Sequence, residues 1–300
     1  MYNMQFFHSS FPLFLMKLSS FALALLGSAL CLQSAQAATV AASISYDTAG
    51  RANTQGQVSQ SLSSTGNDAI YLDSHAFSNF GRNSPDLRAA ADGGHMWTYS
   101  RLHLEGTGQS TVSWQDTIHN SSNSAQNYEM NINVTNMQFH FAPVFDASFA
   151  FSSGYRADIL VDGRSVWHSA QTFEQTSLNG PIEIHKEGFD LGNAVEPVPG
   201  QFHLLEIADY SGKVNLGSFA AGQSANVTYQ LTSLVSWNSP QGCSDMECGR
   251  YLEASIADPF DITGGGSRIQ VSAVPEADTW AMMLGGLGMI GLIAHRRRAA

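Results

Sequence analysis

The stretch from Tyr128 to Phe141 alternates apolar and polar residues, which is the period of a β-strand with one buried face. The apolar positions are first Tyr128, Met130, Ile132 and Val134 and then Met137, Phe139 and Phe141. Because the two sets lie in opposite phase, we expect a bulge or turn around Thr135–Asn136. A chain with such a stretch has to bury one face of a sheet against another layer.

Further strand patterns recur along the chain between Gly- and Ser-rich breaks. We expect strands at Ala42–Tyr46, Met96–Leu104, Thr111–His119, Phe202–Ile207, Asn226–Leu231, Leu234–Trp237, Tyr251–Ile256 and Arg268–Val274. Residues 157–168 predict a hairpin, because Asp162-Gly163 readily takes the positive φ angles of a tight turn. Residues 50–67 show the least pattern, and we expect a long loop or a disordered segment there.

No long segment outside the two ends of the chain keeps the spacing of an amphipathic helix. The sequence therefore predicts an all-β domain over residues 38–273. About ten strands at irregular spacing favour a two-sheet sandwich, of which a jelly-roll-like topology is one form. Two packed sheets bury the apolar faces that a single open sheet would expose to solvent.

Residues 1–37 have the order of a secretory signal peptide. Lys17 precedes the apolar run LSSFALALLGSALCL and the small-residue site Ala35-Gln36-Ala37. A basic residue, an apolar stretch and such a site are typical of a signal peptide, so we expect cleavage between Ala37 and Ala38 and export of the rest.

The last residues, 274–300, predict a weak membrane anchor. The run from Trp280 to Ala294 carries no charge, but fifteen residues span only about 22 Å as a helix, against about 30 Å of hydrocarbon. Arg296, Arg297 and Arg298 would hold the end of this single transmembrane helix on the cytoplasmic side. The sequence thus predicts transient insertion of a precursor into the inner membrane, with its bulk outside.

This tail resembles the PEP-CTERM sorting signal of Gram-negative bacteria. The resemblance is carried by Val274-Pro275-Glu276, by Thr279-Trp280-Ala281 with the apolar stretch after it, and by the three terminal arginines; Ala277 stands where the common form repeats proline. It implies processing near the Pro-Glu motif by a membrane protease called exosortase, followed by release or re-anchoring at the cell surface or in an exopolysaccharide matrix. An ordinary tail anchor that is never cut is the alternative.

Charge restricts the partners of the exported part. Residues 38–274 hold 23 acidic against 10 basic residues, which argues against nucleic acid and anionic membranes. Solubility outside the cell explains this balance, and weak Ca²⁺ binding is the alternative. The aspartates near turns that could contribute to such a site are Asp158, Asp162, Asp258 and Asp261, although turn capping is the commoner role.

Few residues suggest covalent or catalytic chemistry. Cys243 and Cys248 are separated by four residues, and in an oxidising compartment they predict a disulfide that closes a small loop. No H-x-H, H-E-x-x-H or G-x-S-x-G motif is present, so we expect no cofactor, no metal site and no enzymatic activity.

The expected function is that of a structural or adhesive protein of the surface or extracellular matrix, associated with exopolysaccharide or biofilm. A carbohydrate-binding module is the first alternative, and it predicts a row of exposed aromatic residues on one sheet. The candidates are Trp97, Tyr99, Trp114, Trp167, Trp237 and Tyr251, most of which we expect in the core. An exported hydrolase is the second alternative, and it predicts a cleft with paired carboxylates or a triad.

Overall fold

The structure is a computed structural model of the 300-residue chain. It describes residues 38–47, 57–65, 69–74, 85–92, 95–103, 106–141, 150–177, 181–196, 204–238, 251–259 and 271–274, together with Leu287. Within these ranges the chain forms fifteen β-strands: β1 Thr39–Asp47, β2 Gln57–Thr65, β3 Ile70–Asp73, β4 Asp86–Asp92, β5 His95–Leu102, β6 Gly106–His119, β7 Gln126–Phe141, β8 Ala150–Val161, β9 Arg164–Gln175, β10 Glu183–Gly188, β11 Leu204–Ile207, β12 Tyr210–Phe219, β13 Ser224–Asn238, β14 Leu252–Pro259 and β15 Val271–Val274.

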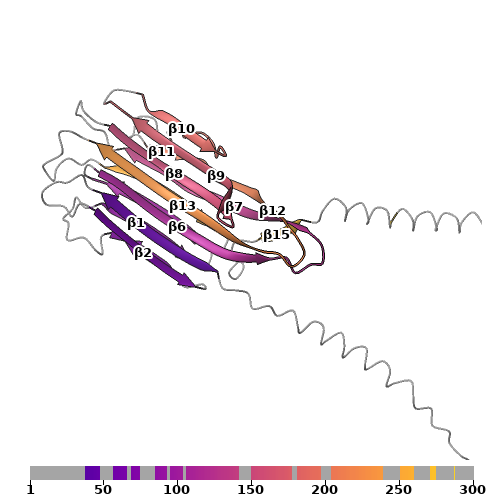
Figure 1. The fold of residues 1–300 in the computed structure, drawn as a ribbon. Coiled ribbons are helices and arrows are strands. Elements are labelled where there is room, and N and C mark those ends of the chain that lie inside the picture. The colour runs from indigo at the N-terminus through magenta and orange to yellow at the C-terminus, as the bar shows by residue number, and fades with distance from the viewer. Residues whose placement is uncertain are drawn as a thin grey trace, which may run out of the picture. The chain divides into compact units, whose positions relative to one another are not determined.

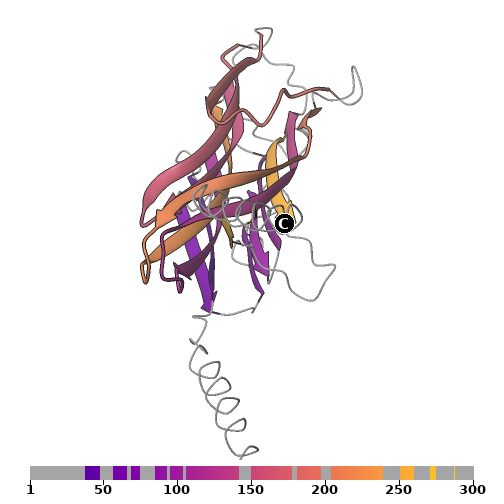
Figure 2. The ribbon, with the colours of Figure 1, turned by 90° about the vertical axis from the view of Figure 1, so that its right-hand side faces the viewer.

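The strands form two antiparallel sheets that pack face to face (Figures 1 and 2). The seven-stranded sheet has the order β10-β9-β8-β13-β6-β1-β2. The eight-stranded sheet has the order β11-β7-β14-β5-β4-β3, and β12 and β15 also pair with β7. The predicted all-β sandwich is confirmed, and its described part has more strands than the eight of a jelly roll.

The phase change expected within residues 128–141 is confirmed in β7. Met130, Ile132 and Val134 are buried, and after the change Met137, Phe139 and Phe141 are buried. Asn136 has a φ of 53°, and the pairing of β7 with β14 shifts register beside it. The expected Asp162-Gly163 hairpin turn is also present, with φ angles of 50° and 76°.

The expectation of a loop or disordered segment over residues 50–67 is wrong for its second half. Residues 57–65 form β2, which pairs antiparallel with β1 from Gln57↔Asp47 to Thr65↔Thr39. A strand of mainly Ser and Gln has little apolar signal of its own, so its pairing partner determines its conformation. The sequence patterns also missed β3, β4, β10 and β12, which are short or rich in Ala, Gly or charged residues.

The core lies between the sheets and is mostly aliphatic and aromatic, with a few polar side chains that connect the two layers. Ser100 of β5 bonds to Ser110 of β6 and Ser233 of β13, with Oγ–Oγ distances of 3.0 and 2.9 Å. Each of these serines is fully buried. Buried hydroxyls need partners, so these bonds fix how one sheet sits on the other.

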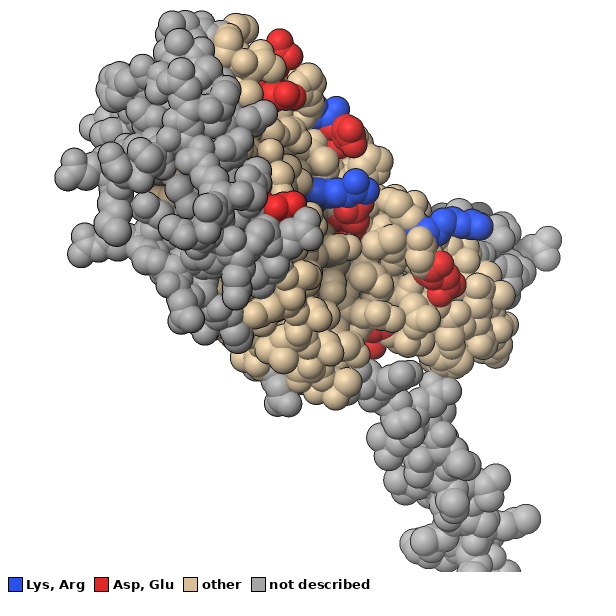
Figure 3. Space-filling model, turned by 60° about the vertical axis from the view of Figure 1, so that its left-hand side comes forward, with Lys and Arg blue, Asp and Glu red and all other residues tan. Residues whose placement is uncertain are grey.

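Charged surface side chains lie beside residues of opposite sign. Figure 3 shows one face on which blue and red groups adjoin and leave a larger uncharged area. Arg156 Nε lies 2.6 Å from Asp158 Oδ2, and Lys186 Nζ lies 2.8 Å from Asp190 Oδ1. Within the described ranges, such pairing leaves few basic groups available to attract an anionic partner.

Candidate functional site

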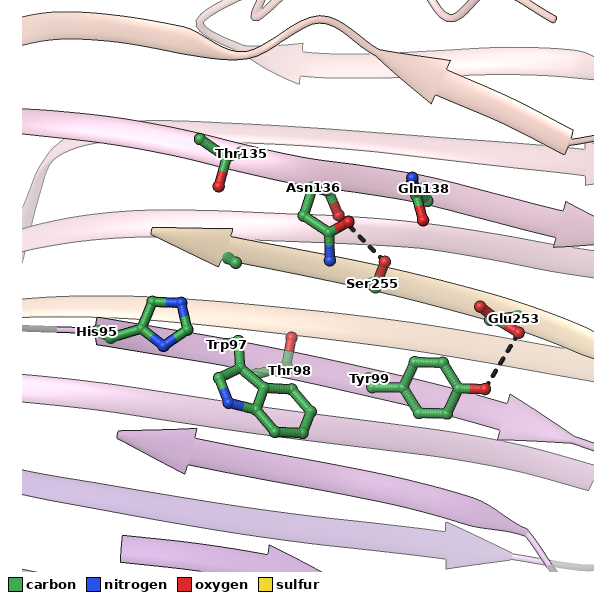
Figure 4. A pocket seen from close by; sticks show the side chains of 10 residues that line it. His95, Trp97, Thr98, Tyr99, Thr135, Asn136, Gln138, Glu253 and Ser255 are labelled. Carbon is green, nitrogen blue, oxygen red and sulfur yellow. Dashed lines mark hydrogen bonds between the residues drawn. The ribbon is translucent and has the colours of Figure 1, made fainter. Parts of the chain in front are cut away.

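A groove of about 450 Å³ lies over β14 on the outer face of the eight-stranded sheet, the face turned away from the other sheet (Figure 4). Its floor is formed by Ser255 and Ala257, which point outward from β14 and yet are only 5 % exposed. These two small residues are flanked by larger side chains on β5 and β7. The groove therefore follows from a row of short side chains between two rows of long ones.

One wall of the groove is aromatic. Trp97 and Tyr99 are two residues apart on β5, so both point outward, and His95 stands at one end of the same row (Figure 4). The register places Trp97 opposite Ala257 and Tyr99 opposite Ser255. Each ring thus stands beside a small floor residue, which leaves the edge of the groove lined by flat apolar surface.

The aromatic surface continues beyond this wall. Tyr71 on β3 lies in the same cross-strand row as Trp97, with Ala90 of β4 between them. The small alanine lets the two rings approach to 6.1 Å between centroids. Tyr71 is 51 % exposed, so the sheet presents two neighbouring rings on its outer face.

The opposite wall comes from the bulge in β7. Because the extra residue changes the phase of the strand, Thr135, Asn136 and Gln138 all line the groove. The carbonyl oxygen of Asn136 accepts a 3.1 Å hydrogen bond from Ser255 Oγ, which joins wall to floor. The Asn136 amide and the Thr135 hydroxyl can both donate and accept hydrogen bonds, whereas Gln138 Nε2 already donates to Glu206 Oε1 at 2.9 Å and leaves its amide oxygen as an acceptor.

Glu253 is the carboxylate at the other end of the groove. Its Oε2 accepts hydrogen bonds from Tyr99 Oη at 3.1 Å and from Arg101 Nε and Nη2 at 3.0 and 2.6 Å. In the described part of the chain these contacts all fall on Oε2, so Oε1 can accept a bond from a ligand. Burial and the nearby Glu253 charge raise the pKa of Tyr99, so its phenol stays protonated and donates to the carboxylate.

Two arginines hold Tyr99 in place. Arg101 and Arg88 lie over its ring at 5.5 and 5.6 Å from the centroid. Arg88 also makes two bonds to Asp86, at 2.8 and 2.9 Å. Arg101 lies 4.5 Å from the centroid of the Tyr251 ring. Cation–π contacts therefore fix the Tyr99 ring, and Asp86 and Glu253 neutralise the charges of the two arginines.

The strands under the groove are attached to the other sheet. Ser110 Oγ donates to the carbonyl oxygen of Tyr99 at 2.8 Å, and Ser153 Oγ donates to that of Glu253 at 2.9 Å. Next to the floor residue Ala257, Asp258 accepts a 2.6 Å bond from Tyr229 of the other sheet. A binding site is more precise when its supports are rigid, and these bonds supply that rigidity.

The structure separates the six aromatic candidates. Trp97 and Tyr99 line the groove, and Tyr251 lies beside it, where its hydroxyl bonds to His140 Nδ1 at 2.6 Å. Trp114 and Trp237 are core residues, and Trp167 packs on Phe189 away from the groove. Sequence reasoning missed Glu253, Asn136 and Gln138, because isolated polar residues on strands look like an ordinary solvated face.

The aspartates considered for Ca²⁺ do not converge in the described residues. Asp158 pairs with Arg156, Asp162 Oδ1 caps the backbone amide of Asn226 at 2.8 Å, and Asp258 is buried. Asp261 lies outside the described residues. Within the ranges that the structure describes, no three His, Cys, Asp or Glu side chains are grouped to hold a metal ion.

Most of the predicted processing residues also lie outside the described residues: Ala37, Cys243, Cys248, Pro275, Glu276, Arg296, Arg297 and Arg298. Ala38 is buried directly before β1, and Val274 is the last residue of β15. Among the described residues, no helix is both long and apolar enough to cross a membrane. The signal cleavage, the disulfide and the transmembrane helix remain predictions.

The fold and the groove define an all-β sandwich domain with a surface site of the size that small ligands occupy. The family model of the PEP-CTERM protein-sorting motif matches residues 273–298. The chain thus carries a PEP-CTERM sorting motif at its C-terminal end, which implies an exported cell-surface protein that is processed by an exosortase.

The other comparisons add nothing to this assignment. No curated protein matches the chain in sequence. A chain of the structure of the infectious bursal disease virus Gx strain aligns with 7 % identity over 84 % of this chain and 74 % of that chain, with a TM-score of 0.09. A TM-score this low carries no argument about the fold or the function.

Proposed function

We propose that the exported domain is a non-enzymatic adhesive protein of the cell surface or matrix that binds exopolysaccharide in the groove over β14. The observation that carries this proposal is the pairing of an aromatic wall, Trp97 and Tyr99, with an amide wall on β7. Sugar rings present apolar C–H faces and a rim of hydroxyl groups. A groove with flat rings on one side and hydrogen-bonding groups on the other complements both features.

The shape and the sorting signal support this function independently. A volume of about 450 Å³ falls in the range of small-ligand sites, so the groove can take a short run of sugar units. Export to the surface brings the domain to the place where exopolysaccharide occurs. A row of aromatic residues on one sheet is also what a carbohydrate-binding module requires.

The residues of the groove favour binding over hydrolysis. A glycosidase needs two carboxyl groups on either side of the bond it cuts. Among the described residues that line the groove, Glu253 is the one carboxylate, and Tyr99 and Arg101 donate hydrogen bonds to one of its oxygens. This arrangement favours an acceptor for sugar hydroxyls, and it supports the adhesive role over the hydrolase alternative.

The test is binding of the purified mature protein to exopolysaccharide from its own cells, measured by affinity electrophoresis or calorimetry. We expect Trp97→Ala to weaken binding at least about tenfold, because truncating an anchoring aromatic typically costs about 2 kcal/mol or more. Phe189→Ala is the matched control, since Phe189 is an exposed aromatic that packs on Trp167 and Tyr210 away from the groove. Equal affinities of wild type and Trp97→Ala would disprove the proposal.

A further inference from the structure

We infer that the groove selects an uncharged glycan, and that polysaccharides bearing carboxylate groups are rejected. This inference rests on the proposed function and names the class of its ligand. It comes from the charges around the groove. Glu253 contributes a negative charge at one end, and among the described residues no lysine or arginine lines the groove. An acidic sugar placed there would lose water and meet a like charge without gaining a cation.

The nearest cations are already engaged. Arg101 donates two hydrogen bonds to Glu253 and lies over two tyrosine rings. Arg88 makes two bonds to Asp86 and lies 3.9 Å from Asp73. Recruiting either guanidinium for a uronate would break a pair that is already well formed. The chain as a whole carries a formal net charge of −11, which further disfavours an anionic polymer.

A neutral sugar meets no such penalty. Glu253 Oε1 can accept a hydroxyl proton, and a hydrogen bond to an ionised carboxylate is stronger than one between neutral groups. On the β7 wall, Asn136 supplies an amide donor and acceptor, and Gln138 supplies its amide oxygen, because Gln138 Nε2 already donates to Glu206 Oε1 at 2.9 Å (Figure 4). Because these groups stand opposite the Trp97 and Tyr99 rings, a pyranose can stack on one wall while its hydroxyls bond to the other.

The rings also suggest how a longer chain continues. The outer face extends from Trp97 over Ala90 to Tyr71, whose ring is 6.1 Å away and half exposed. A chain that leaves the groove at Trp97 can lie on this second ring. We therefore expect affinity to rise with the number of sugar units, and Tyr71→Ala to remove the gain for longer oligosaccharides while leaving short ones unaffected.

The experiment compares the wild-type mature protein on neutral and acidic probes of equal length. The neutral probes are oligomers of glucose, galactose, mannose and N-acetylglucosamine, and the acidic probe is oligogalacturonate, at pH 7 in low and in 150 mM salt. We expect at least one neutral oligomer to bind at least tenfold tighter than the acidic one, with little dependence on salt. Tighter binding of the acidic oligomer, weakened by salt, would overturn the inference.

Glu253→Gln tests the effect of removing the charge at the same site. It removes the negative charge and leaves Arg101 without its partner, so we expect the affinity for oligogalacturonate to rise at least tenfold and that for the neutral oligomer to fall. An unchanged ratio would count against the inference. The wild-type comparison needs no variant, so the inference stays testable if Glu253→Gln does not fold.

The two proposals fail in different ways. Binding to the cells' own exopolysaccharide that depends on Trp97 but is competed only by the acidic oligomer would refute the neutral class and leave the adhesive function intact. Absence of any Trp97-dependent binding would refute both.

Discussion

Asp258 shows how a single buried carboxyl can set the pH response of this domain. Its side chain is fully buried, and burial is the main cause that raises its pKa from 3.8 to about 6. The hydroxyl of Tyr229 and the backbone amide of Asn133 donate to it and act in the opposite direction. These donors do not replace the lost hydration, so the folded protein holds this proton more tightly than the unfolded chain does.

This shift predicts a loss of stability as pH rises. Between about pH 3.8 and pH 6 the folded state binds more protons at Asp258 than the unfolded state, so the free energy of unfolding falls with rising pH. The contribution is complete below the unfolded pKa and lost above the folded one, and it amounts to about 3 kcal/mol. Asp258→Asn can still accept the bond from Tyr229 but does not titrate.

Urea unfolding of wild type and Asp258→Asn from pH 4 to pH 7 measures this contribution as a difference. We expect the variant to gain stability relative to wild type as pH increases through this window. A constant difference between wild type and Asp258→Asn would show that Asp258 titrates normally.

The bulge in β7 is the element that creates the site. Before it, even-numbered residues face the core, and after it, odd-numbered ones do. The change allows consecutive residues, Thr135 and Asn136, to point outward, and Asn136 accepts the left-handed conformation that this requires. Without the bulge, the pattern of Met137, Phe139 and Phe141 would place core side chains on the outer face.

Two substitutions separate the backbone role of Asn136 from its role in binding. Asn136→Gly keeps the left-handed conformation without strain, so we expect near-native stability and weaker glycan binding, because the amide is lost. Asn136→Val has a branched side chain that disfavours this φ, and we expect a loss of about 1–3 kcal/mol of stability. Thermal and urea unfolding measure the stability of both variants, and calorimetry measures their glycan binding. Equal stability of the two variants would argue against the left-handed conformation.

At the scale of the whole molecule, the sorting signal follows the sandwich closely. β15 ends at Val274, inside the matched motif, and Trp280 begins the apolar run six residues later. Even fully extended, these six residues reach only about 22 Å. If the predicted transmembrane helix inserts, the domain is therefore held close to the bilayer. Processing by the exosortase would free the domain to meet a polymer.

Sequence reasoning reached the sandwich, the hairpin turn and the phase change in β7, because each leaves a local pattern of apolar residues or turn residues. It missed β2, since a strand of Ser and Gln is defined by pairing with β1. It named Trp97 and Tyr99 as aromatic candidates but could not separate them from the core residues Trp114 and Trp237. The groove depends on the register of β5, β14 and β7, which pairs residues more than 100 positions apart.

Hydrogen exchange on the mature protein, with and without fragments of its own exopolysaccharide, tests the central claim most directly. Binding in the groove predicts slower exchange at backbone amides of β5, β14 and the bulged part of β7, while the seven-stranded sheet is unchanged. Protection of the seven-stranded sheet alone, with bound glycan present, would contradict the account.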